Sequence, residues 1–301
     1  MSLETLRPKH LNEVVGQIEP IKVLKGYIAH ASAGGMMPSF LLSGPPGVGK
    51  TTCAMAFARD VLGEGWQENW LEINGSEARG IDEVRDHVRP WMDQSPANGA
   101  PFRLLFIDEA EMMTDPAQQA LKRIMERGTG ARVILSCNRL SGIIEAIQSR
   151  CVCLRFRPLG DDDLRTLLGH VAKAENVQAG PERYATAIQY AHGDARRAIH
   201  LFLGTPEENL TLKLAGAIET LFRQGSERGA RIEVFLGYLR SEGIDQWDEV
   251  LEAIGDHVRA KHVGDVDAAL YELATCAFRL SMAQSPLLQL RGTLYGGGVL
   301  P

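Results

Sequence analysis

The segment after Ser43 has the composition of a phosphate-binding loop. It matches the pattern G-x-x-x-x-G-K-[ST], between an apolar run and a helical pattern, and it reads Gly44-Pro45-Pro46-Gly47-Val48-Gly49-Lys50-Thr51-Thr52. Glycines let backbone N–H groups curl around phosphate oxygens, and the N-terminus of the next helix favours negative charge. Lys50 would reach the β- and γ-phosphates, and the Thr51 hydroxyl would ligate Mg²⁺. Nucleotide binding is the strongest single prediction from the sequence.

Polar residues also follow two later apolar runs. Asp108 and Glu109 come after residues 104–107, and Asn138 comes after residues 133–137. Ligands gather at the carboxyl ends of parallel strands, so Asp108 could hold Mg²⁺ through water and Glu109 could polarise the attacking water. Taken alone, such an acidic pair is more often a helix N-terminus; the phosphate loop favours the catalytic interpretation. Asn138 could orient the attacking water or sense the γ-phosphate, although an Asn at a strand end is usually a turn residue.

A parallel sheet would bring these groups together. Apolar runs at residues 40–42, 70–73, 104–107 and 133–136 alternate with amphipathic stretches, which is typical of strands connected by helices. The strand signals stop after Pro158, and a helical tail follows Gly204-Thr205-Pro206, with helices expected at about 211–224, 228–243, 246–261 and 266–284. The sequence predicts an α/β plus all-α fold in three parts: a P-loop ATPase domain at 1–158, a small helical domain at 159–204 and a helical bundle at 205–301.

Composition is that of an ordinary globular protein. The chain has 301 residues, 45% of them hydrophobic and 23% charged, which argues against disorder or a fibre. No signal-peptide pattern and no run of about 18 apolar residues occurs, so we expect a cytoplasmic protein, or a nuclear one in a eukaryotic host. The five cysteines form no C-x-x-C pair, and Cys151-x-Cys153 would alternate on a strand with one thiol buried.

The net charge of −6 is unusual for a nucleic-acid-binding protein. Basic and acidic residues are equal in number over residues 1–160, whereas residues 205–301 carry five more acidic than basic residues. The acidic total therefore does not exclude a DNA-facing surface on the first domain.

Several motifs occur in the order seen in replication factor C small subunits, and they resemble those of the archaeal type most closely. These subunits belong to AAA+ sliding-clamp loaders. Besides the phosphate loop, the motifs are Leu6-Arg7-Pro8-Lys9, Val14-Val15-Gly16-Gln17, residues 71–81, Asp108-Glu109-Ala110, residues 118–126, Ser136-Cys137-Asn138, Ser149-Arg150-Cys151 and Gly193-Asp194-Ala195-Arg196-Arg197. The resemblance covers about residues 5–203. The tail matches only in length and helical character.

This resemblance implies an AAA+ ATPase domain, a helical lid and a C-terminal collar. It further implies an ATPase subunit, with ATP and Mg²⁺ as cofactors, that opens a sliding clamp and places it on primer–template DNA. The partners would be other small-subunit copies, a large subunit, the clamp and DNA, with no membrane involved. The alternatives are another AAA+ remodeller of DNA or protein, or a scaffold subunit that hydrolyses weakly.

The resemblance also assigns residue roles. Asn138 would be the first sensor, Arg196 the second sensor on the lid, and Arg150 a finger into the ATP of a neighbouring subunit; the adenine pocket would be lined by Arg7, Pro8, Val15, Gly16 and Gln17. A cation meeting the γ-phosphate across an interface makes hydrolysis depend on assembly. Without the motif, Arg150 would suit a surface salt bridge and Arg196 an exposed helix position. Of Arg196 and Arg197, we expect one to face the nucleotide and the other solvent.

Two predicted helices carry basic residues that, by the same resemblance, would follow DNA phosphates. These residues are Arg79, Arg85 and Arg89 around residues 82–92, and Lys122, Arg123 and Arg127 on the helix after Asp108-Glu109-Ala110. A solvated helix face is the alternative. Trp91 would either face the clamp or belong to the core. Glu111 is the fourth residue of the motif Asp108-Glu109-Ala110-Glu111. It departs from the family, in which Asp or His usually takes this fourth position.

Overall fold

The computed structural model describes residues 3–127, 130–204, 210–223, 227–244, 246–261, 266–280, 286–296 and 299. The chain divides into two compact units, the first comprising residues 1–177 and 192–196 and the second residues 178–191 and 197–301. Within the described ranges, no helix is both long and apolar enough to cross a membrane. The three-part division at 158 and 204 stays a prediction.

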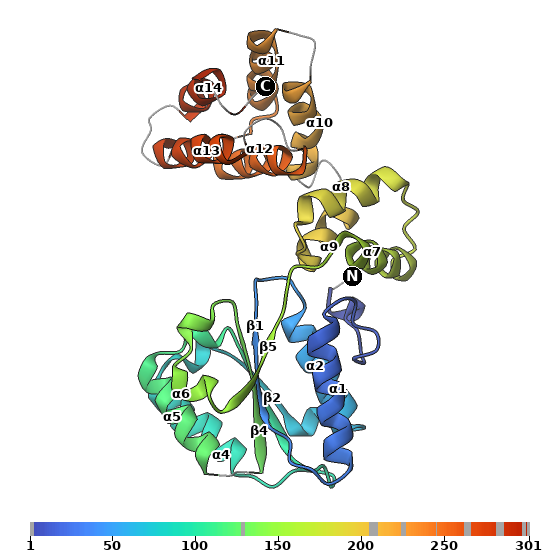
Figure 1. The fold of residues 1–301 in the computed structure, drawn as a ribbon, viewed down its shortest axis with the longest axis vertical. Coiled ribbons are helices and arrows are strands. Elements are labelled where there is room, and N and C mark those ends of the chain that lie inside the picture. The colour runs from blue at the N-terminus through green and yellow to red at the C-terminus, as the bar shows by residue number, and fades with distance from the viewer. Residues whose placement is uncertain are drawn as a thin grey trace. The chain divides into compact units, whose positions relative to one another are not determined.

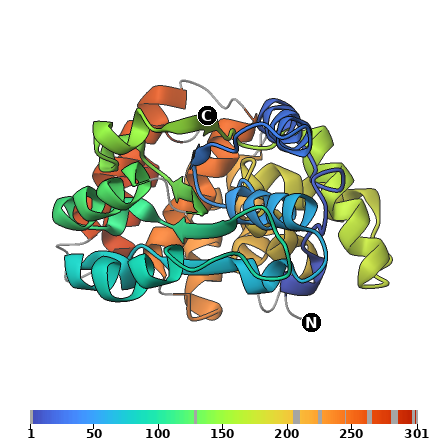
Figure 2. The same cartoon turned by 90° about the horizontal axis from the view of Figure 1, so that it is seen from below.

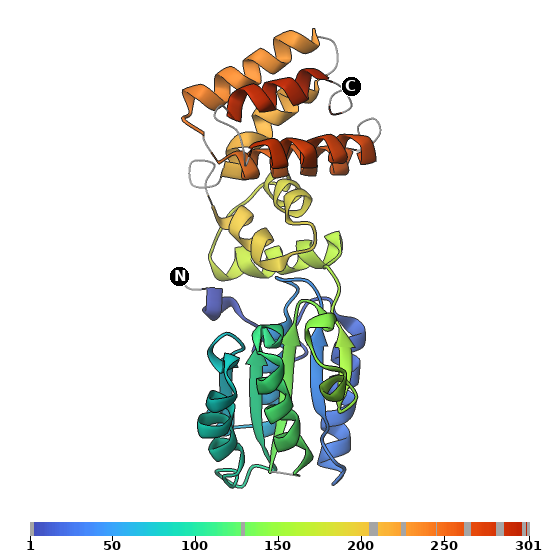
Figure 3. The same cartoon turned by 90° about the vertical axis from the view of Figure 1, so that its left-hand side faces the viewer.

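A five-stranded parallel sheet forms the centre of the first unit. Its strands lie in the order β2-β3-β4-β1-β5, as Figure 3 shows nearly face-on. Their bounds are β1 Ser39–Ser43, β2 Trp70–Asn74, β3 Arg103–Asp108, β4 Ala131–Cys137 and β5 Cys151–Arg155. The four predicted apolar runs coincide with β1 to β4, and the alternating cysteines lie on β5. Because all strands run parallel, their carboxyl ends meet at one edge of the sheet.

Helices cover both faces of this sheet. Alternate strand residues point to opposite faces: Phe40 and Leu42 pack in one core and Leu41 in the other, and β3 divides in the same way. Helices α1 (Ile18–Ser32) and α2 (Lys50–Leu62) lie on one side, and α5 (Asp115–Glu126) and α6 (Glu145–Gln148) on the other (Figures 1 and 2). Burial on both faces explains why β1, β3 and β4 contain continuous apolar runs.

The helical run at residues 81–92 is not a uniform α-helix. Its middle turn, η4 (Val84–Val88), is a π-helix between α3 (Ile81–Glu83) and α4 (Arg89–Met92). Pro90 has no N–H to donate to the preceding turn, and the wider π-turn accommodates that loss. Short 3₁₀ turns join the other elements of this unit: η1 Leu3–Leu6, η2 Trp66–Asn69, η3 Glu77–Arg79, η5 Ala110–Met112 and η6 Leu140–Gly142.

The remaining described elements are helices, as the sequence predicts after Pro158. They are α7 Asp161–Ala174 in the first unit, α8 Pro181–Ala191, α9 Ala195–Leu203, α10 Leu210–Phe222, α11 Arg228–Ser241, α12 Trp247–Lys261, α13 Val266–Leu280 and α14 Pro286–Gly296. Helices α10 to α14 share one apolar core. Helix α14 was not predicted. Helices α10 to α13 agree with the predicted tail helices, apart from their ends.

Candidate functional site

The phosphate loop lies between β1 and α2. Gly47 has a φ of 70°, and a Cβ on it would lie 1.9 Å from Asp194 Oδ1, so both the backbone and the packing require glycine here. Helix α2 begins at Lys50 without a side-chain cap at Gly49. The first N–H groups of α2 are therefore not claimed by a capping side chain, which is the arrangement that suits a phosphate.

Lys50 is buried at the centre of the site. Its Nζ donates to the carbonyl oxygens of Gly44 and Pro45, each at 2.7 Å, and to Asn138 Oδ1 at 2.8 Å. Burial lowers the pKa of Lys50, and the nearby carboxylates, Asp108 foremost, oppose that effect. These contacts place the predicted first sensor, Asn138, against the loop lysine.

Asp108 joins β3 to the phosphate loop. Thr51 Oγ1 donates to Asp108 Oδ2 at 2.7 Å, and the other carboxylate oxygen accepts from Ser136 Oγ and from the Glu109 N–H at 3.0 Å. Hydroxyl and carboxylate oxygens are the ligands that Mg²⁺ prefers, so Thr51 and Asp108 fit the predicted metal role. Ser136 was predicted only as part of a motif, without a role of its own. Its signal is a serine that follows the apolar run Val133-Ile134-Leu135 within β4, and it is 1% exposed.

Glu109 is exposed beside this cluster. Its backbone has a φ of 52°, in the left-handed region that non-glycine residues rarely adopt, and Asn74 Nδ2 lies 3.5 Å from Glu109 Oε2. Such strain is found at functional sites, and here it accompanies the carboxylate expected to act on water. Asn74, at the end of β2, is a neighbour to which the sequence analysis gave no role.

The N-terminal segment predicted to line the adenine pocket lies against the phosphate loop and α2. Gln17 Nε2 donates to the carbonyls of Val48 at 3.2 Å and Arg157 at 2.6 Å, which ties the segment to the loop. Arg7 donates to Met55 of α2, and the Pro8 carbonyl accepts from Arg59. Val15 and Gly16 immediately precede Gln17 and are half-buried.

The start of α9 contacts the phosphate loop. The Ala195 N–H donates to the Gly47 carbonyl at 2.9 Å, which puts the exposed Arg196 one residue beyond a loop contact. Arg197 does not face solvent as expected: it pairs with Glu252 and with Asp256, whose side chain is only 2% exposed. The buried carboxylate of Asp256 lies on α12 in the second unit. A buried carboxylate requires a cationic partner, and Arg197 is one such partner.

Arg150 lies at the C-terminal end of α6. One terminal nitrogen donates to the Ala146 carbonyl at 2.7 Å, and the other pairs with Glu126 of α5. Lys122, one turn earlier on α5, also pairs with Glu126, at 3.4 Å. The contacts of Arg150 are thus with α5 and α6, whereas Lys50, Thr51, Asp108 and Asn138 form one connected cluster.

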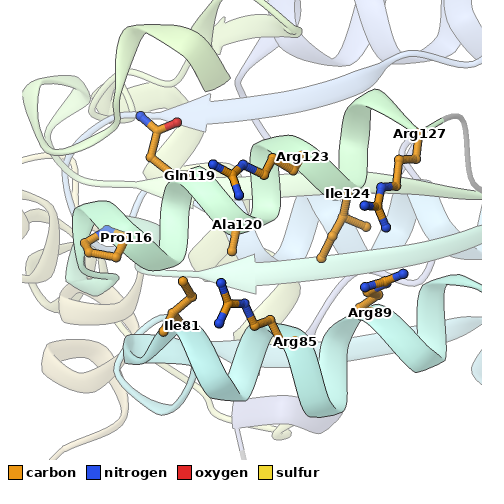
Figure 4. A pocket seen from close by; sticks show the side chains of 9 residues that line it. All are labelled: Ile81, Arg85, Arg89, Pro116, Gln119, Ala120, Arg123, Ile124 and Arg127. Atoms are coloured by element: carbon orange, nitrogen blue, oxygen red, sulfur yellow. The ribbon is translucent and has the colours of Figure 1, made fainter.

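Four arginines line a cavity of about 440 Å³ between α5 and the helical run at 81–92 (Figure 4). Arg85 and Arg89 come from one helix and Arg123 and Arg127 from the other. Among the described residues, Arg89 pairs with Asp93, whereas the other three form no ion pair. Of the residues predicted to follow DNA phosphates, Arg79 and Lys122 do not line the cavity, whereas Arg127 does. We call this cavity the arginine groove.

Trp91 contributes to the core rather than to an isolated exposed patch. Its ring packs partly against the core beneath α5, and the Arg103 guanidinium lies 4.8 Å from the ring centroid. Arg103 is itself 8% exposed and donates to the Trp91 carbonyl. These contacts favour the core interpretation of Trp91 over a clamp contact.

Residues 40–159 match the family model described as "ATPase family associated with various cellular activities (AAA)". This region, which includes the phosphate loop, Asp108 and Asn138, is therefore similar to AAA ATPase domains. The resemblance to replication factor C small subunits is confirmed: the subunit of Archaeoglobus fulgidus is 43% identical over 203 residues, 67% of this chain and 62% of that protein. That of Methanothermobacter thermautotrophicus is 45% identical over 200 residues, 66% of this chain and 61% of that protein. The matched region thus spans about three fifths of these curated relatives.

Solved structures confirm the AAA+ fold class. A RuvB of Thermotoga maritima, described as a Holliday junction branch migration motor, superposes with a TM-score of 0.58 at 20% identity, covering 95% of this chain and 91% of that one. A single-residue variant of the same RuvB gives the same values. At this identity the similarity concerns the fold alone.

Proposed function

We propose that the chain binds ATP with Mg²⁺ and hydrolyses it as a subunit of a sliding-clamp loader. The observation that carries the nucleotide part is the convergence of Lys50, Thr51, Asp108 and Asn138 through hydrogen bonds of 2.7 to 2.8 Å. The clamp-loader part is supported by the identity to replication factor C small subunits over two thirds of the chain.

The residues divide the chemistry among them. Lys50 and the N–H groups at the start of α2 would bind the β- and γ-phosphates, and Thr51 and Asp108 would hold Mg²⁺, which supplies neutralisation of phosphate charge. Glu109 would orient and polarise the attacking water, and Asn138 would fix the γ-phosphate against Lys50. The segment from Arg7 to Gln17 would enclose the adenine, and Arg196 would approach from the lid.

Arg150 is proposed to act on a neighbour. Its guanidinium is directed by α5 and α6 rather than by the phosphate loop of its own chain, which suits a group that acts in trans. A cation supplied across a subunit interface stabilises charge on the transferring phosphoryl group and makes turnover depend on assembly. The partners would be further small subunits, a large subunit and the clamp.

The arginine groove is proposed to bind the DNA backbone. Arg85, Arg123 and Arg127 make no ion pair among the described residues, so their charge is available to phosphates. Contacts of this type give affinity without sequence preference. The proposal therefore places the basic contact surface at Arg85, Arg89, Arg123 and Arg127 and leaves out Arg79 and Lys122.

A hydrolysis assay with Glu109→Gln tests the proposed function. In complex with its partner subunits, wild-type turnover should rise when a clamp and primed DNA are both added. Glu109→Gln should bind ATP normally but lose about 100-fold in turnover at this subunit's own sites, because it lacks the group that polarises water. The control is Glu72→Gln, which removes an exposed carboxylate from β2.

The outcomes separate the alternatives. Complex turnover that is unchanged in Glu109→Gln would identify a scaffold subunit that hydrolyses weakly. Turnover that responds to neither clamp nor primed DNA would contradict the clamp-loader assignment and favour another AAA+ remodeller.

A further inference from the structure

Glu111 is a half-buried acidic group that the mechanism above does not use. It lies in η5, two residues after Glu109, and its Oε1 accepts a hydrogen bond from the backbone N–H of Asn138 at 2.8 Å. Its other carboxylate oxygen is enclosed and has no hydrogen-bond partner among the described residues. Enclosing a carboxylate oxygen without a partner costs free energy, so the arrangement calls for a compensating role.

The side chain of Glu111 is confined from a second direction. Gly142, in η6, packs so closely that a Cβ on it would lie 2.6 Å from the Cβ of Glu111. Glu111 thus fits between the turn that carries it and the turn that follows the sensor strand. Its contact with Asn138 is a charge-assisted hydrogen bond to backbone, which is stronger than a neutral hydrogen bond.

Asn138 needs such a support because, within the described ranges, its backbone makes no hydrogen bond other than the one to Glu111. Strand β4 ends at Cys137, and Asn138 is exposed. Its amide oxygen accepts from Lys50 Nζ at 2.8 Å, so a shift of its backbone would move the amide away from the phosphate-binding lysine. A displacement of about 1 Å at a catalytic group is enough to lower a rate markedly.

We infer that Glu111 is a positioning residue, which holds the backbone of Asn138 so that the sensor amide stays against Lys50. This inference rests on the proposed function, because it assumes that Asn138 acts in hydrolysis. Glu111 itself touches no reacting atom. It acts through Asn138, so its removal should alter turnover rather than nucleotide affinity.

The first experiment measures turnover and ATP affinity of Glu111→Ala in the assembled complex, alone and combined with Asn138→Ala. We expect about a tenfold loss of kcat with ATP Kd changed less than about twofold, and almost no further loss in the Asn138→Ala background. Met112→Ala, an exposed neighbour in the same turn, is the control. An unchanged kcat, or equal losses in both backgrounds, would overturn the inference.

The second experiment measures hydrogen exchange at the Asn138 amide, which needs no hydrolysis. Exchange should accelerate in Glu111→Ala, because the amide loses its acceptor, and also in Gly142→Ala, which keeps Glu111 but displaces its side chain. Gly142→Ala keeps the test decisive if Glu111→Ala does not fold. Unchanged exchange in the folded variant overturns the inference. Absence of hydrolysis in the wild-type complex would instead refute the proposed function. The two failures can be distinguished, because hydrogen exchange reports on the bond between Glu111 and Asn138 without hydrolysis.

Discussion

At the residue scale, Lys50 has all three ammonium hydrogens engaged by the Gly44 and Pro45 carbonyls and by Asn138. A bound phosphate can therefore reach Lys50 only by replacing at least one of these acceptors. Replacing a neutral carbonyl by a charged phosphate oxygen strengthens the hydrogen bond, and it also offsets the burial that lowers the pKa of Lys50. Nucleotide binding should thus occur together with the loss of at least one of these three Lys50 contacts.

Thiol reactivity provides a residue-level prediction. Burial raises the pKa of Cys53 and Cys151 to about 12 and that of Cys137 to about 11, so at pH 8 these thiols are protonated and unreactive. Burial raises the pKa of Cys153 as well, but its side chain is exposed.

We expect iodoacetamide at pH 8 to label Cys153 at least tenfold faster than Cys53, Cys137 and Cys151, as followed by peptide mass spectrometry. In denaturant the differences should vanish. Labelling of Cys53 as fast as Cys153 in the folded chain would contradict the described burial.

The residues that the sequence could and could not assign differ in their local signal. Lys50 and Thr51 were assigned because the spacing of glycines, lysine and threonine is specific to phosphate loops. Ser136 and Asn74 were not, because their roles arise from strand pairing, which brings them against Asp108 and Glu109. Glu111 was noted only as a departure from a family pattern, and its bond to Asn138 depends on how two turns pack.

At the element scale, strands were easier to predict than helix details. Strands β1, β3 and β4 are covered on both faces, so each contains an apolar run that the sequence shows plainly. The π-turn at Val84–Val88 was not predicted, because periodicity over a dozen residues does not distinguish it from a regular helix. Helix α14 was missed as well, because the apolar residues of its sequence do not form a clear helical pattern.

The arginine groove leads to a prediction at this scale. Arg85 and Arg123 line it from two helices, whereas Lys122 is paired with Glu126 outside the lining. Arg123→Ala and Arg85→Ala should each weaken the binding of primed DNA to the assembled complex. Each should also make the plot of log association constant against log salt concentration less steep, by roughly one unit of slope per substituted copy that contacts phosphate.

Lys122→Ala is the matched control for this salt titration, because it removes a similar charge from the same helix as Arg123. It should leave both affinity and slope nearly unchanged. An effect of Lys122→Ala equal to that of Arg123→Ala would mean that phosphates follow the outer face of α5 instead of the groove.

At the scale of the whole molecule, charge is divided between regions with different tasks. The segment that carries the nucleotide site and the arginine groove is balanced in charge, whereas residues 205–301 hold the five surplus acids. A lone chain with a net charge of −6 should bind DNA weakly, because few phosphates are neutralised per copy. Tight binding would arise when several copies present their grooves to one duplex, which links DNA affinity to assembly.

In the proposed function, the same link to assembly would govern hydrolysis through Arg150. The Glu126 pair that holds its guanidinium has both side chains 37% exposed, and an exposed pair of this kind contributes only about 0–1 kcal/mol, too little to withhold Arg150 from a triphosphate. Arg150→Ala should therefore leave ATP binding intact but lower the clamp- and DNA-stimulated turnover of the complex by about 1,000-fold at the sites that receive it. Steady-state hydrolysis measured on the complex and on the isolated chain checks this. If the isolated wild-type chain hydrolyses ATP as fast as the complex, Arg150 does not act across an interface.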